Sequence, residues 1–277
     1  MFYLVKTPWW LKKLYSRLVW DLRDRAWAGV RGGGAMTMPG PRGGGETASG
    51  GKGPGVGDKD GSGRGDEGEI SRRKDGPGGG EILKGGRRTG EGEGDEKILY
   101  LSFDDGPHPV ATPLVLDLLK QYGARATFFC IGKNVQEHPQ IYRRILSEGH
   151  RVGNHTHNHL NGWKVSDEAY IENIRLAARY IDSDLFRPPY GRISAWQADL
   201  LRRPPFNFSI IMWEVLSADF DRALRPERCA RNVVRHARPG SIVVFHDSEK
   251  AMDRLRGALP VVLDHFSRLG YRFEGIF

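Results

Sequence analysis

Strand-like and helix-like segments alternate along the 277-residue chain from Lys97 to its last residue, Phe277. Short apolar runs alternate with segments whose apolar residues recur at helical spacing. The expected strands are 98–103, 126–131, 151–154, 185–187, 208–215, 241–246 and 271–277, and the expected helices are 113–122, 139–148, 167–182, 195–202, 226–237 and 252–269. About seven βα units in one domain predict a parallel sheet curled into a barrel, with functional residues at the carboxyl ends of its strands.

Composition divides the chain into three segments. Residues 29–96 hold 26 of the 37 glycines, few large apolar side chains, and 11 basic against 12 acidic residues. Such a segment buries too little apolar surface to offset its ordering entropy, so we expect a disordered linker there and a single α/β domain over 97–277. The balanced charge of 29–96 is not that of a basic nucleic-acid-binding arm, and no nucleic-acid partner is expected despite the net charge of +8.

Residues 1–28 form an N-terminal arm with an expected amphipathic helix from Trp9 to Trp20, preceded by Thr7-Pro8 as a start signal. We expect its apolar stripe to pack on the main domain; contact with a membrane surface through Trp and basic residues is the alternative. Charged residues interrupt any signal-peptide core, and no apolar run is long enough to span a bilayer. A cytoplasmic or membrane-peripheral location is the default expectation. Cys130 and Cys229 are expected to be reduced thiols.

Two motifs predict a metal site at the end of the first expected strand. Asp104-Asp105-Gly106-Pro107 follows an apolar run, and His155-Thr156-His157-Asn158-His159 comes fifty residues later. One carboxylate and two imidazoles would leave coordination positions open on a divalent ion, as a catalytic zinc requires. Neighbouring side chains diverge on an extended chain, so the other carboxylate is a candidate general base. The spacing pairs His155 with His159 on a helical turn, or His157 with His159 on an extended backbone.

Three further polar clusters fall at or near predicted strand ends. Arg187 precedes two prolines on a stiff segment that suits the orientation of a carboxylate, and the backbone N–H of Tyr190 is a candidate oxyanion donor. His246 ends an apolar strand and is a candidate general acid, if a carboxylate holds its tautomer. Asp219 is the first candidate for that carboxylate, with Asp247 and Asp221 as alternatives.

In their order along the chain, these motifs resemble those of the polysaccharide deacetylases of the NodB-homology type, carbohydrate esterase family four. The matching pieces span 97–277 and are Ser102-Phe103-Asp104-Asp105-Gly106-Pro107, His155-Thr156-His157-Asn158-His159, Arg187-Pro188-Pro189-Tyr190, Asp219-Phe220 and Val244-Phe245-His246-Asp247. The resemblance implies a distorted (β/α)7 barrel and metal-dependent removal of acetyl groups from an N-acetylated glycan, such as peptidoglycan or a chitin-like polymer.

The resemblance also implies a role for each matching residue. Asp105, His155 and His159 would bind the metal, usually zinc, with cobalt or nickel as alternatives. The other matching residues would take part in the chemistry: Asp104 as the base, His246 as the acid, Arg187 orienting Asp104, the Tyr190 N–H stabilising the oxyanion and Asp219 tuning His246.

The chain departs from the family pattern at three positions. Leu216 stands in place of a frequent carboxylate, Phe220 in place of Trp in the acetyl pocket, and Val244 where Leu is frequent. These changes bear on substrate size and affinity. Alternative functions are hydrolysis of a small non-sugar amide at the same site, a non-catalytic glycan-binding module, or an interaction protein working through the Gly-rich segment.

Overall fold

The computed structural model describes residues 4–14, 18–20 and 96–277. The predicted linker over 29–96 lies outside the described residues except for Glu96, and so do residues 21–28 of the N-terminal arm. Among the described residues, no helix is long and apolar enough to cross a membrane.

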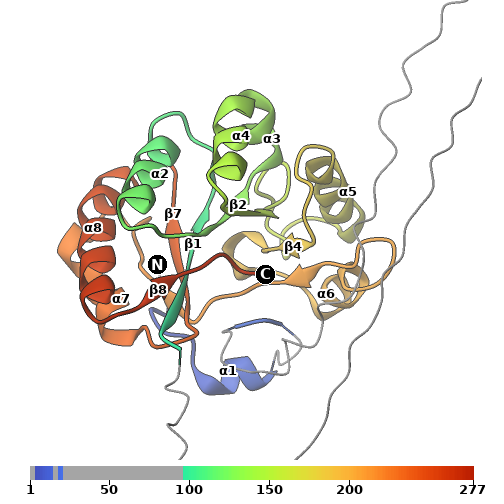
Figure 1. Cartoon of the computed structure of the whole chain (residues 1–277). Helices are drawn as coiled ribbons and strands as arrows, with labels where there is room; N and C mark the ends of the chain where they lie inside the picture. The colour runs from blue at the N-terminus through green and yellow to red at the C-terminus, as the bar shows by residue number, and fades with distance from the viewer. Residues whose placement is uncertain (1–3, 15–17, 21–95) are drawn as a thin grey trace, which may run out of the picture. The chain divides into compact units, whose positions relative to one another are not determined.

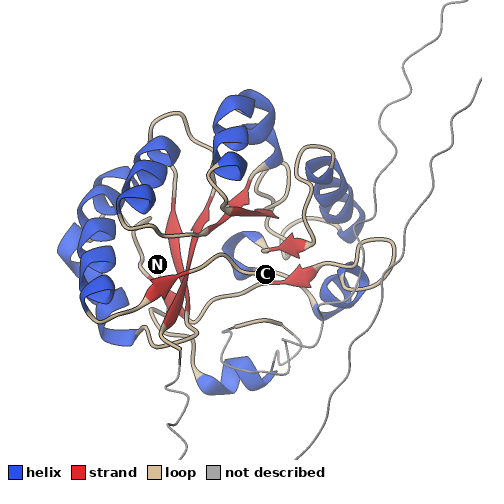
Figure 2. Ribbon diagram, in the orientation of Figure 1, coloured by secondary structure: helices blue, strands red, loops and turns tan. Residues whose placement is uncertain are grey.

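A parallel sheet of eight strands forms the centre of the domain (Figure 2). Its order is β5-β4-β3-β2-β1-β7-β6, and β8 pairs with β1. The strands are β1 (Ile98–Asp104), β2 (Thr127–Cys130), β3 (Arg151–Asn154), β4 (Leu185–Phe186), β5 (Ser209–Ile210), β6 (Val215–Leu216), β7 (Ile242–His246) and β8 (Arg272–Phe273). Nearly every strand residue is buried, as expected for a parallel sheet with covered faces. The predicted curled (β/α)7-type barrel is confirmed.

Helices surround this sheet in Figure 1. They are α2 (Ala111–Gln121), α3 (Gly132–Glu137), α4 (Pro139–Ser147), α5 (Asp167–Ala178), α6 (Ala195–Leu201), α7 (Pro226–His236) and α8 (Met252–Arg268). All six helices predicted for this domain are present, with ends within a few residues of the prediction. The sequence reading missed the short helix α3 and the 3-10 turn η2 (Pro189–Gly191).

The prediction of one strand over 208–215 is wrong. This stretch contributes β5, at one end of the sheet, and the start of β6, at the other end. β5 pairs with β4, whereas β6 pairs with β7, so the connecting residues cross between the two ends of the curled sheet. The apolar run is continuous because both pieces are buried, and periodicity alone cannot show where a buried chain changes its partner strand.

The N-terminal arm lies against these same two strands. Helix α1 (Trp9–Leu14) begins where the sequence predicts, but Val19 forms a parallel bridge to Ile211, so the predicted helix does not extend to Trp20. Leu18 and Trp20 are buried in a cluster with core residues of α5 and β5. The expectation that the arm packs on the main domain is met by these contacts.

Three aromatic rings hold the centre of the sheet together. Phe103 of β1 faces Phe128 of β2 and Phe245 of β7 in register, with ring centroids 5.1 and 6.1 Å apart. All three side chains are fully buried, and each contributes on the order of 1.5–3 kcal/mol by leaving water. Helix residues such as Leu116, Leu119 and Leu259 complete this core.

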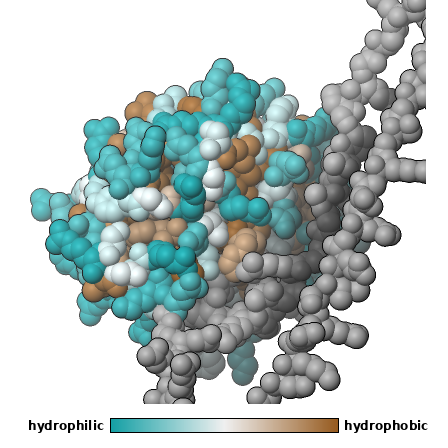
Figure 3. Space-filling model, in the orientation of Figure 1, coloured by the Kyte–Doolittle hydropathy of each residue, from teal (hydrophilic) through white to brown (hydrophobic). Residues whose placement is uncertain are grey.

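On the face drawn in Figure 3, hydrophilic residues predominate, with smaller apolar areas between them.

We predict that Gly153→Ala destabilises the domain. A Cβ at Gly153 would lie 2.5 Å from two ring carbons of Phe129, which is fully buried in the neighbouring strand. Such overpacking costs about 1–3 kcal/mol. Urea unfolding followed by circular dichroism should show this loss, whereas Val261→Ala, at an exposed position on α8, should change the free energy of unfolding by less than about 0.5 kcal/mol. Equal stability of the two variants would contradict the prediction.

Candidate active site

The two adjacent carboxylates at the end of β1 point in different directions. Asp104 closes the strand, and Asp105 adopts a left-handed backbone with φ 81°, which Asp tolerates better than most residues. The side-chain amide of Asn134 donates to the Asp105 carbonyl at 2.7 Å and holds this turn. The structure therefore gives each carboxylate its own surroundings.

Asp105, His155 and His159 form one cluster, with their candidate ligand atoms all within 4.8 Å of one another. Asp105 Oδ1 lies 3.2 Å from His159 Nε2 and 3.8 Å from His155 Nε2. This oxygen is buried and has no hydrogen-bond partner among the described residues. An orphaned carboxylate oxygen beside two imidazole nitrogens fits a divalent cation, and three protein ligands match the donor set of a catalytic zinc site.

Outer hydrogen bonds orient both imidazoles of this cluster. His155 Nδ1 lies 2.7 Å from the Arg187 carbonyl, which can only accept, so Nδ1 carries the proton and Nε2 has its lone pair free toward Asp105. Burial lowers the pKa of His155 to about 4, so it is neutral as a ligand must be. His159 Nδ1 lies 3.1 Å from the hydroxyl of Tyr190.

His157 lies outside the cluster, so the alternative pairing of His157 with His159 is not formed. Its ring stacks on Tyr180 with centroids 5.7 Å apart. Its Nδ1 lies so close to Gly132 that a Cβ there would be 2.7 Å away. Thr156 and His159 adopt positive φ angles of 64° and 55° in this loop. As a result, His155 and His159 lie beside Asp105, whereas His157 packs on Tyr180.

The second carboxylate, Asp104, is held by the fully buried Arg187. The Arg187 guanidinium donates from Nη1 to Asp104 Oδ1 at 2.7 Å and to Ser102 Oγ at 2.8 Å. Its Nε donates to the carbonyl of Ile211 at 3.2 Å, and its Nη2 donates to the carbonyl of Met212 at 3.0 Å. The guanidinium also stacks on the Phe129 ring, 3.9 Å from its centroid. This charge is therefore paired and nearly saturated with acceptors, as a buried arginine must be.

His246 faces the same rim from the neighbouring strand, because Asp104 and His246 are register partners of β1 and β7. Asp219 Oδ1 lies 2.8 Å from His246 Nδ1, and Asp219 Oδ2 accepts from the His246 backbone N–H at 2.8 Å. Burial disfavours the charged imidazolium, but Asp219, Asp105 and Asp104 outweigh it and raise the pKa of His246 to about 9. The side chain of Arg254 holds the Asp219 carbonyl at 2.7 Å.

The two other carboxylates considered as partners of His246 serve elsewhere. Asp247 accepts from the Gly106 N–H at 3.0 Å and from Thr112 Oγ1 at 2.6 Å, so it fixes the turn after β1. A Cβ at Gly106 would lie 2.0 Å from Asp247 Oδ2, which is why only glycine fits there. Asp221 accepts from the backbone N–H of Ala223.

Tyr190 lies in η2 with a positive φ of 59°. Its side chain is 57% exposed and packs edge-on against His159, with ring centroids 4.5 Å apart. Within the described part of the chain, no acceptor is found for its backbone N–H. The left-handed turn therefore places Tyr190 beside the Asp105, His155 and His159 cluster and leaves its backbone N–H available to another group.

Sequence reasoning did not find several residues that hold this site. Ser102 donates to the Val243 carbonyl at 2.9 Å and receives Arg187 Nη1, and Thr112 holds Asp247. A serine in an otherwise apolar buried strand was a signal for such a role. The carbonyls of Ile211 and Met212 carried no signal, because every residue has a carbonyl.

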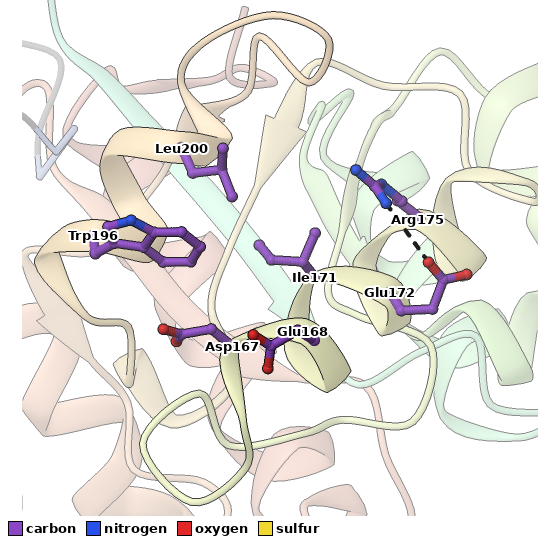
Figure 4. Close-up of a pocket in the computed structure, with 7 residues that line it drawn as sticks. All are labelled: Asp167, Glu168, Ile171, Glu172, Arg175, Trp196 and Leu200. Carbon is purple, nitrogen blue, oxygen red and sulfur yellow. Dashed lines mark ion pairs between the residues drawn. The ribbon is translucent and has the colours of Figure 1, made fainter.

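Two surface pockets lie away from these residues. One, of about 320 Å³, opens between α5 and α6 (Figure 4) and another between α7 and α8. The first is lined by Asp167, Glu168, Ile171, Glu172, Arg175, Trp196 and Leu200. Neither pocket is lined by any of the candidate site residues described above, so the candidate active site rests on the convergence of side chains and not on cavity size.

The chain is similar to known deacetylases in sequence. Residues 91–207 match the family model for polysaccharide deacetylase. A peptidoglycan-N-acetylglucosamine deacetylase of Bacillus cereus is 38% identical over 200 residues, covering 70% of this chain and 92% of that protein. A chitooligosaccharide deacetylase of Azorhizobium caulinodans is 35% identical, covering 59% of this chain and 81% of that protein.

Solved structures show the same similarity in three dimensions. The structure of the peptidoglycan deacetylase PdaC from Bacillus subtilis, in its D285S mutant, superposes with a TM-score of 0.59 at 26% identity and covers 66% of this chain and 89% of that one. Sequence relatives, the matched model and this superposition all name deacetylases. The chain belongs to the polysaccharide deacetylase family, the NodB-homology hydrolases of carbohydrate esterase family four.

Proposed function

We propose that this protein hydrolyses the N-acetyl groups of a glycan that contains N-acetylglucosamine, using a divalent metal held by Asp105, His155 and His159. One observation carries the proposal: a buried carboxylate, Asp104, and an imidazole, His246, are register partners beside one cluster of three candidate ligands. The relatives named for peptidoglycan and chitooligosaccharide deacetylation support this substrate class. Zinc is the first candidate, with cobalt and nickel as alternatives.

The chain's residues divide the proton transfers between them. Arg187 binds Asp104 Oδ1, so Oδ2 accepts the proton of the water that attacks the acetyl carbonyl. The Tyr190 N–H stabilises the negative charge that develops on the carbonyl oxygen. His246 then donates a proton to the nitrogen as the C–N bond breaks, which yields acetate and a free amine. A bound metal supplies Lewis acidity at this site.

Asp219 sets the protonation state of His246 in this scheme. A general acid works only when it is protonated, and the pKa of about 9 keeps His246 charged at neutral pH. Phe220 packs edge-on against His246, with ring centroids 5.2 Å apart. The Phe in place of the family's Trp therefore borders the acid, where it would contact the acetyl group.

We predict that Asp104→Asn greatly lowers turnover, because an amide cannot accept the proton. Acetate release from N-acetylglucosamine oligomers and peptidoglycan fragments should fall by about 10²–10⁴-fold. Metal content should match that of the unaltered protein, whereas the melting temperature should fall because the buried Arg187 loses its charged partner. Asp253→Asn, at an exposed position on α8, is the matched control and should keep full activity. A panel of small non-sugar amides tests the alternative substrate class; turnover of those amides alone would overturn the glycan proposal.

We predict that Asp219→Asn shifts the alkaline limb of the pH–rate profile to lower pH. Loss of the carboxylate lets the pKa of His246 fall from about 9 toward its ordinary 6.5. Activity requires protonated His246 and is lost as pH rises through this pKa, so the variant should lose activity at a lower pH. A kcat profile from pH 5 to 10 measures the shift, and an unmoved limb would rule out Asp219 as the partner of the acid.

We predict that chelation removes activity and that added zinc or cobalt restores it. His155→Gln should lower metal affinity about 10-fold or more in equilibrium dialysis, because it removes one of three protein ligands. His157→Gln is the control, since its ring lies against Tyr180 outside the cluster, and metal affinity should be unchanged. Full activity in thoroughly chelated protein would show that the reaction needs no metal.

A further inference from the structure

The crossing segment, residues 210–216, connects β5 to β6 and spans the two ends of the sheet. In the sheet itself β5 pairs with β4 and β6 pairs with β7. The outer edges of β5 and β6 would thus offer backbone groups to other chains or to water. These backbone groups need hydrogen-bond partners where the β5 and β6 ends of the curled sheet approach each other.

The N-terminal arm satisfies them on both edges. Beside β6, the backbone N–H of Thr7 donates to the Glu214 carbonyl at 2.9 Å, and Leu216 donates to the Val5 carbonyl at 2.8 Å. Beside β5, Val19 donates to the Ile210 carbonyl at 3.0 Å, and Met212 donates to Val19 at 2.7 Å. The arm therefore clamps the crossing segment from outside by four backbone hydrogen bonds.

Two side chains of the arm strengthen this clamp. Thr7 is buried, and its hydroxyl donates to the Trp213 carbonyl at 2.7 Å. Lys12 Nζ lies 3.1 Å from Glu214 Oε1, a carboxylate whose residue is only 2% exposed. Ser241 donates to the other oxygen of Glu214 at 2.6 Å. Burial of a carboxylate is costly unless such partners bind it.

The inner side of the same segment holds the base-orienting arginine. Arg187 donates to the carbonyls of Ile211 and Met212, while its Nη1 binds Asp104 Oδ1. The crossing segment thus lies between the arm outside and Arg187 inside. A displacement of this segment moves two of the acceptors that set the position of the guanidinium.

We propose that Thr7 and Lys12 are positioning residues for the general base, acting through the crossing segment and Arg187. The arm is then a working part of the catalytic domain, although residues 29–97 separate it from β1. This inference rests on the proposed function, because it assigns Asp104 the role of base. Small displacements of catalytic groups lower turnover steeply without changing how substrate is held.

The test compares matched variants of the full-length, metal-loaded protein. Thr7→Val keeps the shape but removes the hydroxyl, Thr7→Ser keeps the hydroxyl, and Lys12→Met removes the charge. Lys13→Met makes the same change at an exposed neighbour and is the control. We expect kcat for acetate release to fall roughly tenfold in Thr7→Val and Lys12→Met with KM and metal content unchanged. Thr7→Ser and Lys13→Met should retain the kcat of the unaltered protein.

Hydrogen exchange at the Met212 and Leu216 amides gives a readout that does not depend on turnover. Both amides donate to the arm, so both should exchange faster in Thr7→Val and Lys12→Met but not in Lys13→Met. An unchanged kcat in both variants, or a loss of kcat equal in Thr7→Ser and Thr7→Val, would overturn the inference. Unchanged exchange would overturn the clamp itself. Absence of acetate release from the unaltered protein would instead refute the proposed function, and the exchange data would still decide the clamp.

Discussion

The buried guanidinium of Arg187 is the interaction on which the rest of the site depends. A charge with no exposed surface must be matched by acceptors, and here they come from two parts of the chain: Asp104 and Ser102 of β1, and the crossing segment. The carbonyl of the same residue holds His155 by its Nδ1. Arg187 thus contacts the candidate base, one candidate metal ligand and the crossing segment.

The site sets two histidines to opposite protonation states. Burial lowers the pKa of His155 to about 4 and leaves it neutral, whereas the carboxylate of Asp219 helps raise the pKa of His246 to about 9. The first state suits a metal ligand and the second suits a proton donor. Both residues are histidines at the rim of one sheet, so their surroundings decide which chemistry each can do.

Much of the fold and the site could be predicted from sequence, because short local patterns of residues indicate the helices, the strands and the polar strand ends. Apolar runs and helical periodicity placed nearly all helices and most strands, and polar motifs at strand ends marked Asp104, Asp105 and His246 as candidates. The split of 208–215 was not predictable, because a continuous buried run shows no change of partner strand. The helix predicted to Trp20 was too long for a related reason: Val19 pairs with Ile211, a residue remote in sequence.

The sequence by itself determined the chemistry available to this protein: which side chains stand at the strand ends, and the family to which their order belongs. Only the tertiary structure decided between the alternatives. It excluded His157 from the cluster, chose Asp219 over Asp247 beside His246, and brought Thr7 against the segment that holds Arg187. The physical reason is that residue types and spacing are local, whereas hydrogen-bond partners and burial depend on contacts between segments far apart in the chain.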